Sequence, residues 1–235
     1  MPATSRVGGR APRIGTADIV RVGRALGMNA LSVKAVAAEL DVTAAALYRH
    51  IDGRWDLERL VGESILADLD LVDDPRHGVE AHLLSFALQL REFTIAHPGL
   101  ARYLQLLFPR GDSGRRLLTV EVEALARRGY SPEAAIVVSG AVATLTIAMA
   151  ASEELSIATE REDGGGLDRE RAAATAGLQV DDHLAAPHAT LPQVQRPEYV
   201  RLVLTGAIRG LLGSAPPGRP VADIIADLAA TEKEL

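Results

Sequence analysis

Apolar side chains recur every three to four residues along most of this chain, which is the spacing of one buried face of an α-helix. Val33, Val36, Ala37 and Leu40, for example, occupy positions i, i+3, i+4 and i+7. Because this period continues along the chain, we expect an all-α protein. Besides two short helices within residues 31–54, the pattern predicts helices at about 17–26, 55–71, 79–96, 99–108, 114–128, 132–152, 198–212 and 221–228.

The two short helices within residues 31–54 are joined by about three residues. Ser32 and Thr43 stand at their starts, where serine and threonine commonly cap a helix. The second helix turns Leu47 and Ile51 inward but is barely two turns long, so it cannot be stable alone in water. The first helix must hold it, while its polar and cationic face meets a partner. This arrangement describes a helix-turn-helix, which places its second helix in the major groove of DNA.

The second helix and the residues after it resemble a known family. The segment Leu47-Tyr48-Arg49-His50, followed by Ile51, Asp52-Gly53-Arg54 and Asp56-Leu57, is similar to the TetR family of one-component bacterial repressors. The turn that precedes it carries Asp41 in place of the usual glycine, and aspartate tolerates the left-handed conformation better than most residues. The candidate DNA-binding residues are Lys34, Thr43, Ala44, Ala45, Tyr48, Arg49, His50 and Arg54.

Three of these candidates are expected to contact the phosphate backbone. Tyr48 and His50 match positions that bind phosphate in the family. Arg54 begins the next helix, whose free amides also favour an anion. Such contacts would position the protein on DNA without reading its sequence. The alternative for Tyr48 and His50 is that they are merely packed helix residues.

The residues at the N-terminal end of the second helix predict few direct hydrogen bonds to bases, which is a thin direct readout. Ala44 and Ala45 cannot form bidentate hydrogen bonds to purines, but their methyl groups can lie against thymine methyls. Polar specificity would come from Thr43, from Lys34 on the preceding helix and from Arg49. The alternative for Arg49 is a solvated surface charge.

The charge distribution supports DNA binding only in the N-terminal part. The chain has 235 residues and a net charge of −6. Residues 1–60 contain nine Lys and Arg against six Asp and Glu, whereas residues 61–235 contain sixteen against twenty-five. A positive head on an acidic body fits a protein that meets phosphates at one end. Arg6, Arg10 and Arg13 lie in a Gly- and Pro-containing segment that is either a DNA-contacting arm or a solvated tail.

The resemblance to the TetR family extends into the C-terminal part. The His97-Pro98 helix end, the Gly129-Tyr130-Ser131-Pro132-Glu133 helix start and the long loop before the last strong helix look like tetracycline-repressor-type C-terminal domains. The resemblance implies an apolar pocket for a small-molecule inducer, and a homodimer formed through a four-helix bundle. Helices 134–152 and 198–212 fit that bundle. Candidate ligand-binding residues are Phe86, Leu90, Phe93, Tyr103, Leu107, Thr144 and Met149. For each of them the alternative, a plain core residue without ligand contact, is the favoured interpretation.

We divide the chain at the boundaries that these patterns indicate. The parts are a flexible basic arm at 1–13, a helix-turn-helix DNA-binding domain at 14–54, and a helical ligand-binding and dimerisation domain at 55–235, with a connector helix at 55–71 and a long loop at 156–197. Within that loop, a short helix near 168–175 is an open alternative. Residues 134–152 carry no charge, so a membrane span has to be considered. Their flanks are acidic and the stretch is alone, which indicates a buried helix and no membrane association.

Chemistry of other kinds is poorly supported. The chain has no cysteine, and it lacks the phosphate-binding, serine-hydrolase and zinc-protease motifs. His77 and His82 are five residues apart, a poor ligand spacing on a helix, and are expected to be surface or capping residues. We therefore expect no enzyme, no metal and no cofactor. Since no apolar leader is visible, we expect a cytoplasmic protein.

These patterns lead to one prediction and two alternatives. We predict a transcriptional repressor that binds a palindromic operator as a homodimer and is released by a small apolar ligand. The first alternative is a constitutive DNA-binding protein of the same fold, without an inducer. The second is an enzyme or carrier whose N-terminal helices merely resemble a DNA-binding head.

Overall fold

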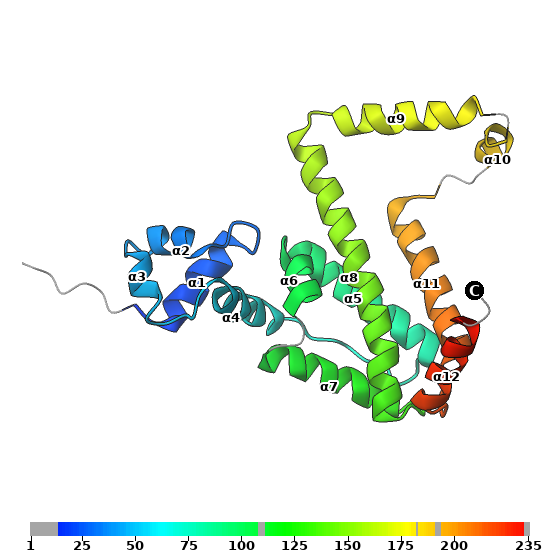
Figure 1. Ribbon diagram of the computed structural model, residues 1–235, viewed down its shortest axis with the longest axis horizontal. Helices are drawn as coiled ribbons and strands as arrows, with labels where there is room; N and C mark the ends of the chain where they lie inside the picture. The colour runs from blue at the N-terminus through cyan, green and yellow to red at the C-terminus, as the bar shows by residue number, and fades with distance from the viewer. Residues whose placement is uncertain (1–13, 108–110, 182, 191–193, 233–235) are drawn as a thin grey trace, which may run out of the picture.

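The computed structural model describes residues 14–107, 111–181, 183–190 and 194–232. These residues form twelve α-helices and no strand, which confirms the predicted fold class. Figure 1 shows a small N-terminal lobe, drawn in blue, attached to a larger helical body. The predicted basic arm at 1–13 lies outside the described residues.

The N-terminal lobe, here called the head, contains α1 (Thr16–Leu26), α2 (Val33–Glu39) and α3 (Ala44–Leu47). Its centre is formed by Ile19, Val36, Leu47 and Ile51, each no more than 2% exposed. These are the positions that the helical period placed inside. The head therefore owes its fold to a small apolar cluster that all of its short helices share.

The helix starts in the head confirm two of the predicted caps. The Ser32 Oγ accepts a hydrogen bond from the Ala35 amide at 3.1 Å, and the Thr43 Oγ1 accepts one from the Ala46 amide at 3.2 Å. At the start of α1 the sequence favours Thr16 as the cap, but Gly15 occupies that position and its amide donates to the Asp18 Oδ2 at 3.1 Å. Asp41 has φ of 52°, as the turn was expected to require.

Helix α4 (Arg54–Leu66) connects the head to the body and ends before the predicted position at residue 71. A side chain from the body binds one carbonyl oxygen at the end of α4 and another just after it. The Arg116 guanidinium donates to the carbonyl oxygen of Leu66 at 3.3 Å and to that of Leu69 at 2.8 Å. Because these bonds stabilise the helix end, the chain can leave the helix and turn Leu69 into the core, where it is 5% exposed.

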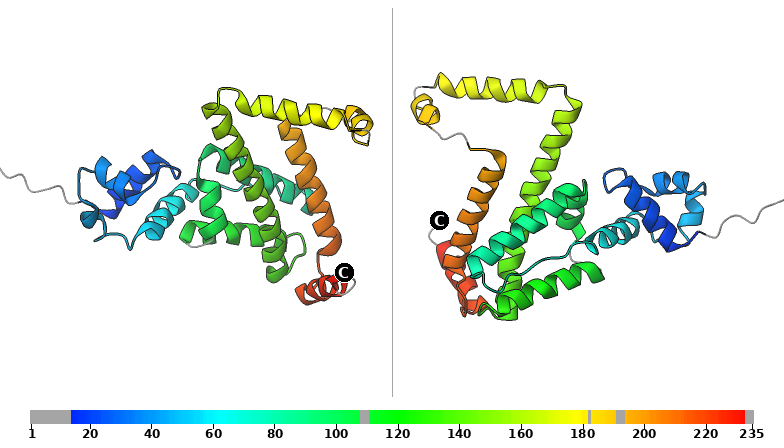
Figure 2. Two further views of the ribbon diagram at one scale, coloured as in Figure 1. Left: turned by 45° about the horizontal axis from the view of Figure 1, so that its top comes forward. Right: turned by 180° about the vertical axis from the view of Figure 1, so that it is seen from behind.

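The body consists of α5 (Val79–Ala96), α6 (Leu100–Leu107), α7 (Asp112–Ala126), α8 (Pro132–Glu162), α11 (Arg196–Ser214) and α12 (Val221–Glu232). Helix α8 is central and packs against α5, α6, α7 and α11. Figure 2 shows the same arrangement from two further sides. Among the described residues, α8 is the one helix that is long and apolar enough to cross a membrane. It lies in the body with one face buried, which is the environment of a core helix.

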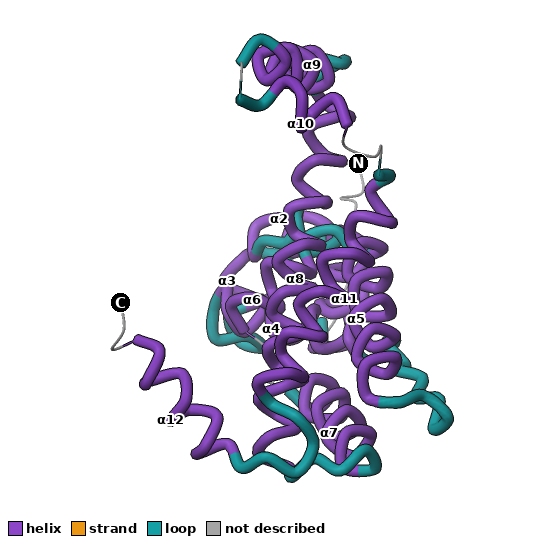
Figure 3. Tube along the Cα trace, turned by 90° about the vertical axis from the view of Figure 1, so that its right-hand side faces the viewer, coloured by secondary structure: helices purple, strands orange, loops and turns teal. Residues whose placement is uncertain are grey.

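The expected long loop at 156–197 is wrong for most of its length. Helix α8 continues to Glu162, and two further helices follow, α9 (Gly166–Gln179) and α10 (Ala185–Thr190), neither of which has a buried residue. Figures 1 and 3 show α9 and α10 standing away from the other helices. The short helix considered near 168–175 lies within α9, which is longer. Hydrophobic periodicity gives little signal for helices that bury no face. Gly164 and Gly165 adopt positive φ and separate α8 from α9.

Candidate nucleic-acid interface and ligand cavity

The residues predicted to contact DNA are all exposed on the head. They are Lys34, Thr43, Ala44, Ala45, Tyr48, Arg49, His50 and Arg54. Leu47, at 0% exposure, lies among them and anchors the segment, whereas the neighbouring Tyr48 is 55% exposed. Because Tyr48 and His50 are both exposed, the alternative that they are packed helix residues does not fit the structure. One buried side chain therefore holds a segment whose remaining side chains face solvent.

Helix α3 is a single turn of four residues. Its stability must come from the buried contacts of Leu47 and Ile51, because one helical turn does not form alone in water. The Thr43 hydroxyl accepts from the Ala46 amide, which leaves its own proton free to donate. Ala44 and Ala45 follow as exposed methyl groups. The leading end of α3 thus presents one hydroxyl and two methyl groups, a surface suited to the thin readout expected from the sequence.

Arg54 is held by two neighbours that sequence reasoning did not identify. Its Nε donates to the Glu58 Oε1 at 2.7 Å, and its guanidinium carbon lies 5.4 Å from the centre of the Trp55 ring. Trp55 is 55% exposed, which is unusual for so large an aromatic side chain. The ion pair and the ring orient the guanidinium and leave its terminal nitrogens available. Trp55 was detectable only as the chain's single tryptophan next to a candidate cation.

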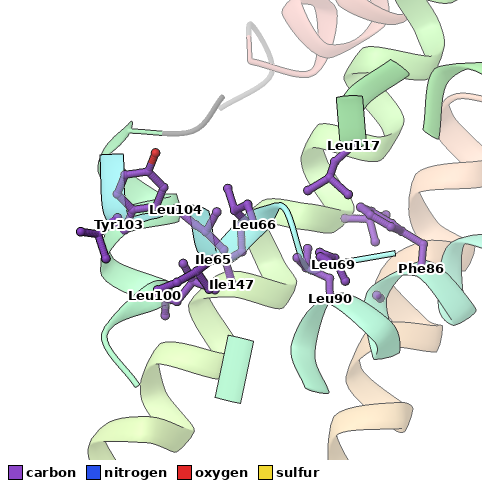
Figure 4. Close-up of a cluster of buried hydrophobic side chains, with 14 of the residues drawn as sticks. Ile65, Leu66, Leu69, Phe86, Leu90, Leu100, Tyr103, Leu104, Leu117 and Ile147 are labelled. Carbon is purple, nitrogen blue, oxygen red and sulfur yellow. The ribbon is translucent and has the colours of Figure 1, made fainter. Parts of the chain in front are cut away.

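The body contains a cavity of about 60 Å³ between the end of α4, α5, α7 and α8. Figure 4 shows Leu69, Phe86, Leu90 and Leu117 gathered at this place. The lining is Leu66, Leu69, Leu71, Phe86, Leu90, Leu104, Leu117, Leu118, Glu121, Ser139, Gly140, Ala143 and Ile147. The cavity is therefore almost wholly apolar, with Glu121 and Ser139 as its polar side chains.

Only Phe86 and Leu90 of the predicted ligand-binding residues line this cavity. The other described candidates lie elsewhere in the body. Phe93 packs its ring against His97 at 4.3 Å between ring centres, and Thr144 is exposed. Met149 lines a different hollow, between α8 and α11.

Tyr103 and Leu107 were also predicted to contact the ligand. Tyr103 is buried beneath α4, where its ring contacts the position of Gly62 and its hydroxyl lies 3.3 Å from the Glu63 Oε1. The Leu107 side chain lies outside the described part of the chain. A helical pattern of apolar residues indicates which side chains face inward, but it does not indicate which neighbours they contact.

A buried ionic network lies next to the cavity. His82 is 4% exposed, contrary to the expected surface position, and both of its ring nitrogens face carboxylates. Its Nδ1 is 2.9 Å from the Asp73 Oδ1 and its Nε2 is 2.9 Å from the Glu121 Oε1. Asp73 also accepts from Arg128 at 2.6 Å and from Arg127 at 2.7 Å. Burial opposes ionisation of Asp73, but these arginine hydrogen bonds outweigh it and lower the pKa of Asp73 well below its ordinary range.

Helix α4 is clamped to the start of α7 by Glu63. This carboxylate accepts from the amides of Ser113 at 2.8 Å, Gly111 at 3.1 Å and Gly114 at 3.2 Å. The N-terminus of a helix favours a negative charge, because its amides and its dipole point at it. The connector is therefore tied to α7 at Glu63, and again at its C-terminal end through Arg116.

The head also touches the body away from α4. The Asn29 side-chain amide donates to the Glu154 Oε1 on α8 at 2.9 Å. The same oxygen accepts from the Gly99 amide, at the start of α6, at 2.6 Å. Gly99 has φ of 88°, and a Cβ there would lie 2.7 Å from the Asn29 backbone nitrogen. The orientation of the head is thus set by contacts with α8 and α6 as well as by the connector.

Helices α8 and α11 both carry large apolar side chains that are exposed. Ile136 and Val137 on α8 are 49% and 42% exposed, and Tyr199 and Leu202 on α11 are 56% and 64% exposed. Scattered apolar side chains are normal on a protein surface, but a set of large ones on two packed helices is typical of an interface.

Comparison with known proteins identifies the fold. No family model and no curated protein matches the sequence. The crystal structure of the ligand-free form of ActR, a TetR family protein from Streptomyces coelicolor, matches with a TM-score of 0.71 and 21% identity, over 86% of this chain and 98% of ActR. A complex of ActR with actinorhodin matches with a TM-score of 0.70 and 22% identity, over 86% of this chain and 99% of that one.

A more distant match is a TetR variant from Acinetobacter baumannii AYE in complex with minocycline. It has a TM-score of 0.56 and 18% identity, over 85% of this chain and 95% of that chain. The matched structures span the head and the body together, since each match covers most of both chains. The protein therefore has the fold of the TetR family of transcriptional regulators.

Proposed function

We propose that the protein is a transcriptional repressor that binds a palindromic operator as a homodimer and leaves it when a small apolar ligand enters the body. The observation that carries this proposal is the one-turn helix α3, anchored by Leu47 and by the following Ile51, with the predicted DNA-binding side chains around it exposed. These exposed side chains add no packing contacts to the short helix, so we assign them to contacts with a partner. The likeness in fold to DNA-binding regulators supports the same reading.

On DNA, the head residues would act in two ways. Tyr48, His50 and Arg54 would contact phosphates and fix the register of the head. Trp55 joins them as a proposed member of this interface, since its ring orients the Arg54 guanidinium. The methyl groups of Ala44 and Ala45 would then lie against bases in the major groove.

Two heads are needed for adequate specificity, because a single α3 offers few base contacts. The exposed apolar side chains of α8 and α11 are the proposed dimer interface, in a four-helix bundle of two helices from each chain. A dyad between the bodies would place the two recognition segments about 34–36 Å apart, or at a multiple of that distance.

Ligand binding would act on the connector. The cavity takes part of its wall from Leu66, Leu69 and Leu71, at the end of α4 and just after it. A ligand that widens the cavity would push this segment away from α7. This movement would strain the hydrogen bonds that Glu63 and Arg116 form between α4 and α7. Since α4 begins next to the DNA-contacting residues, its displacement would change the spacing of the two heads. A typical coupling of 1–3 kcal/mol would weaken operator binding about 5- to 150-fold.

Structures of related fold support binding of a small molecule. ActR has been solved with actinorhodin, and the Acinetobacter protein with minocycline. Binding of a larger molecule here would require the 60 Å³ cavity to widen. The same small volume favours the second candidate function, a constitutive DNA-binding protein without an inducer. The two differ in whether a cavity ligand changes the affinity for the operator.

The test measures binding to DNA from the protein's own upstream region, and to selected random DNA, as a function of salt concentration. Counterion release predicts a steep loss of affinity with salt, because several phosphates are neutralised. In the Tyr48→Phe/Arg54→Ala double variant we expect weaker binding and a shallower salt dependence. The matched control is Arg169→Ala on α9, an exposed arginine outside the head.

Wild-type binding that is absent from both DNA pools would contradict the proposal, as would equal effects of the double variant and the control. Molecules that bind in the cavity are then added to the DNA complex. Release of DNA supports the repressor with an inducer, and unchanged affinity favours the constitutive alternative.

A further inference from the structure

The head meets the body at a contact that does not involve α4. The loop between α1 and α2 carries Asn29, whose side-chain amide donates to the Glu154 Oε1 on α8 at 2.9 Å. The same oxygen accepts from the Gly99 amide, at the start of α6, at 2.6 Å. A single carboxylate oxygen therefore joins the head to two helices of the body.

The backbone is closely packed at the same place. A Cβ at Gly99 would lie 2.7 Å from the Asn29 backbone nitrogen and 2.8 Å from the Met28 Cβ. Met28 is partly buried and packs against the hydrophobic core. The head loop thus lies directly against the start of α6, and the hydrogen bonds to Glu154 belong to a packed contact, here called the Asn29–Glu154 contact.

The head is also attached along α4. On the head side, a Cβ at Gly23 on α1 would lie 2.4 Å from the Val61 side chain, so the two helices touch there. On the body side, the Tyr103 ring lies against Gly62. Two rigid bodies joined along one helix can still turn about the axis of that helix. A contact away from this axis opposes the turn, and the Asn29–Glu154 contact is placed to do so.

The angle of the head decides where α3 lies. Figure 1 shows α3 on the side of the head away from α6, so the contact and the DNA-facing segment are at opposite ends of the lobe. A small rotation of the head would therefore displace α3 relative to the body. In a dimer, such rotations change both the distance between the two α3 helices and the directions in which they face.

The geometry of the DNA duplex makes both quantities matter. One additional base pair between two half-sites moves them apart by about 3.4 Å. It also turns one half-site relative to the other by roughly 34–36°. Two heads held at fixed angles fit one such arrangement. Heads that are free to turn can follow several arrangements with a smaller loss of binding.

We propose that Glu154, acting through Asn29, fixes the angle of the head and thereby sets the half-site spacing that the protein selects. This inference rests on the proposed function, because it requires a dimer bound to a palindrome. Glu154 lies on α8, outside the DNA-facing surface of the head, so it is a positioning residue. Its loss should change the preference among spacings and leave the contacts within each half-site in place.

The test compares operators that differ only in spacing. A palindrome selected from random DNA is lengthened or shortened by one base pair at its centre, and the affinity of the full-length protein for each form is measured. We expect the wild type to bind the altered forms about a hundredfold more weakly, because the second head then loses base contacts that are each worth about tenfold. Equal wild-type affinity for every form would overturn the proposal.

Two variants remove the contact from opposite sides. Asn29→Ala leaves the hydrogen bond between Gly99 and Glu154 in place, whereas Glu154→Ala removes both bonds. In each variant the spacing penalty should fall about tenfold, which is the value of one hydrogen bond to a charged group. The double variant should be no more tolerant than the single ones, since both substitutions break the same contact.

The matched control is Glu162→Ala, which removes an exposed glutamate from the same helix. We expect it to keep the wild-type spacing penalty. An unchanged penalty in both Asn29→Ala and Glu154→Ala, or an equal change in the control, would overturn the proposal.

A second measurement follows the angle of the head without DNA. Because the chain has no cysteine, Ala38→Cys on α2 and Ala158→Cys on α8 allow spin labels at two exposed positions. Labelled chains diluted with unlabelled ones report the distance within one chain. Asn29→Ala should broaden the distribution of this distance, and an unchanged distribution would overturn the proposal.

The inference and the proposed function fail in different ways. Salt-sensitive DNA binding with the same spacing penalty in the wild type and in both variants would leave the regulator standing and remove the role of Glu154. Absence of DNA binding by the wild type would remove the proposed function, and the inference that rests on it would fall as well.

Discussion

The head and the body expose their functional residues in opposite ways. The head displays them outward from a one-turn helix, and the neighbours along the chain decide which side chains face solvent. The body encloses its candidate site between segments that lie up to about 80 residues apart, from Leu66 to Ile147. The exposed side chains of one short motif can therefore be identified from their positions in the sequence. The residues that line a cavity cannot, because they come from distant segments.

The connector helix α4 belongs to both regions and shows how they are joined. On the head side, the Arg24 guanidinium on α1 hydrogen-bonds the Ser64 hydroxyl at 3.2 Å and forms an ion pair with Asp68. On the body side, Glu63 and Arg116 tie the same helix to α7. A substitution in the head, in the body or at this joint should therefore have a distinguishable signature.

The largest effect is expected from a charge placed on the outward face of the head. Ala44→Glu would set a carboxylate against the phosphate backbone and bases, where a like charge costs several kcal/mol. We expect DNA affinity to fall by at least about two orders of magnitude, with the free energy of unfolding and the binding of small molecules in the cavity unchanged. Ala222→Glu, at an exposed position of α12, is the control. An equal loss in the two variants would break the distinction between head and body.

The next largest effect is expected where the connector meets the body. A Cβ at Gly62 would lie 2.6 Å from the Tyr103 ring, so Gly62→Ala forces α4 and α6 apart. We expect the free energy of unfolding, from urea titration, to fall by about 1–3 kcal/mol. Gly177→Ala on α9 meets nothing within 4 Å and should be neutral or slightly stabilising. Equal stability of the two variants would show that α4 is not closely packed on the body.

The buried network around Asp73 should make the stability of the protein sensitive to acid. Arginine hydrogen bonds lower the pKa of Asp73 below its ordinary value of 3.8 against the effect of burial. The resulting stability is present above that value and is lost as the pH falls towards the folded-state pKa, because the unfolded chain then binds the extra proton. We expect about 2 kcal/mol to be lost between about pH 4 and pH 2. Asp73→Asn should show a shallower decline, and an unchanged slope would contradict this assignment.

The smallest effect is expected at the clamp between α4 and α7. Glu63→Gln keeps a hydrogen-bonding group but removes the charge that faces the N-terminus of α7. We expect a loss of about 1 kcal/mol in the free energy of unfolding. The ligand-induced change in operator affinity should be altered as well. Glu92→Gln, an exposed glutamate on α5, should change neither. A normal ligand response in Glu63→Gln would show that the clamp does not transmit the effect of the cavity.

The head was predictable because its signals are local. Ser32 and Thr43 cap helices that begin next to them, Leu47 and Ile51 are one turn apart, and Asp41 takes the left-handed turn. Each of these features depends on residues within a few positions in the sequence. The pattern therefore specified both the fold of the head and the set of side chains that it exposes.

The ligand cavity was predictable only in part, because its wall is a product of packing. Phe86 and Leu90 were expected from their helix face, but that face also carries Phe93, which packs on His97 instead. His82 was expected at the surface because the residues next to it in the sequence do not indicate that it has carboxylate partners. Asp73 lies on the loop before its helix, and Glu121 lies 39 residues away on α7.

By itself, the sequence determined the all-α class, most helix positions in the body and the arrangement of the head, since these follow from helical period and capping over short distances. Tertiary structure decided where α4 ends, through the Arg116 side chain, and which residues surround the cavity. It also decided the course of α9 and α10, which bury no face and so leave no periodic signal. Contacts between distant segments depend on how helices pack, and a local pattern specifies which face is buried but not what it meets.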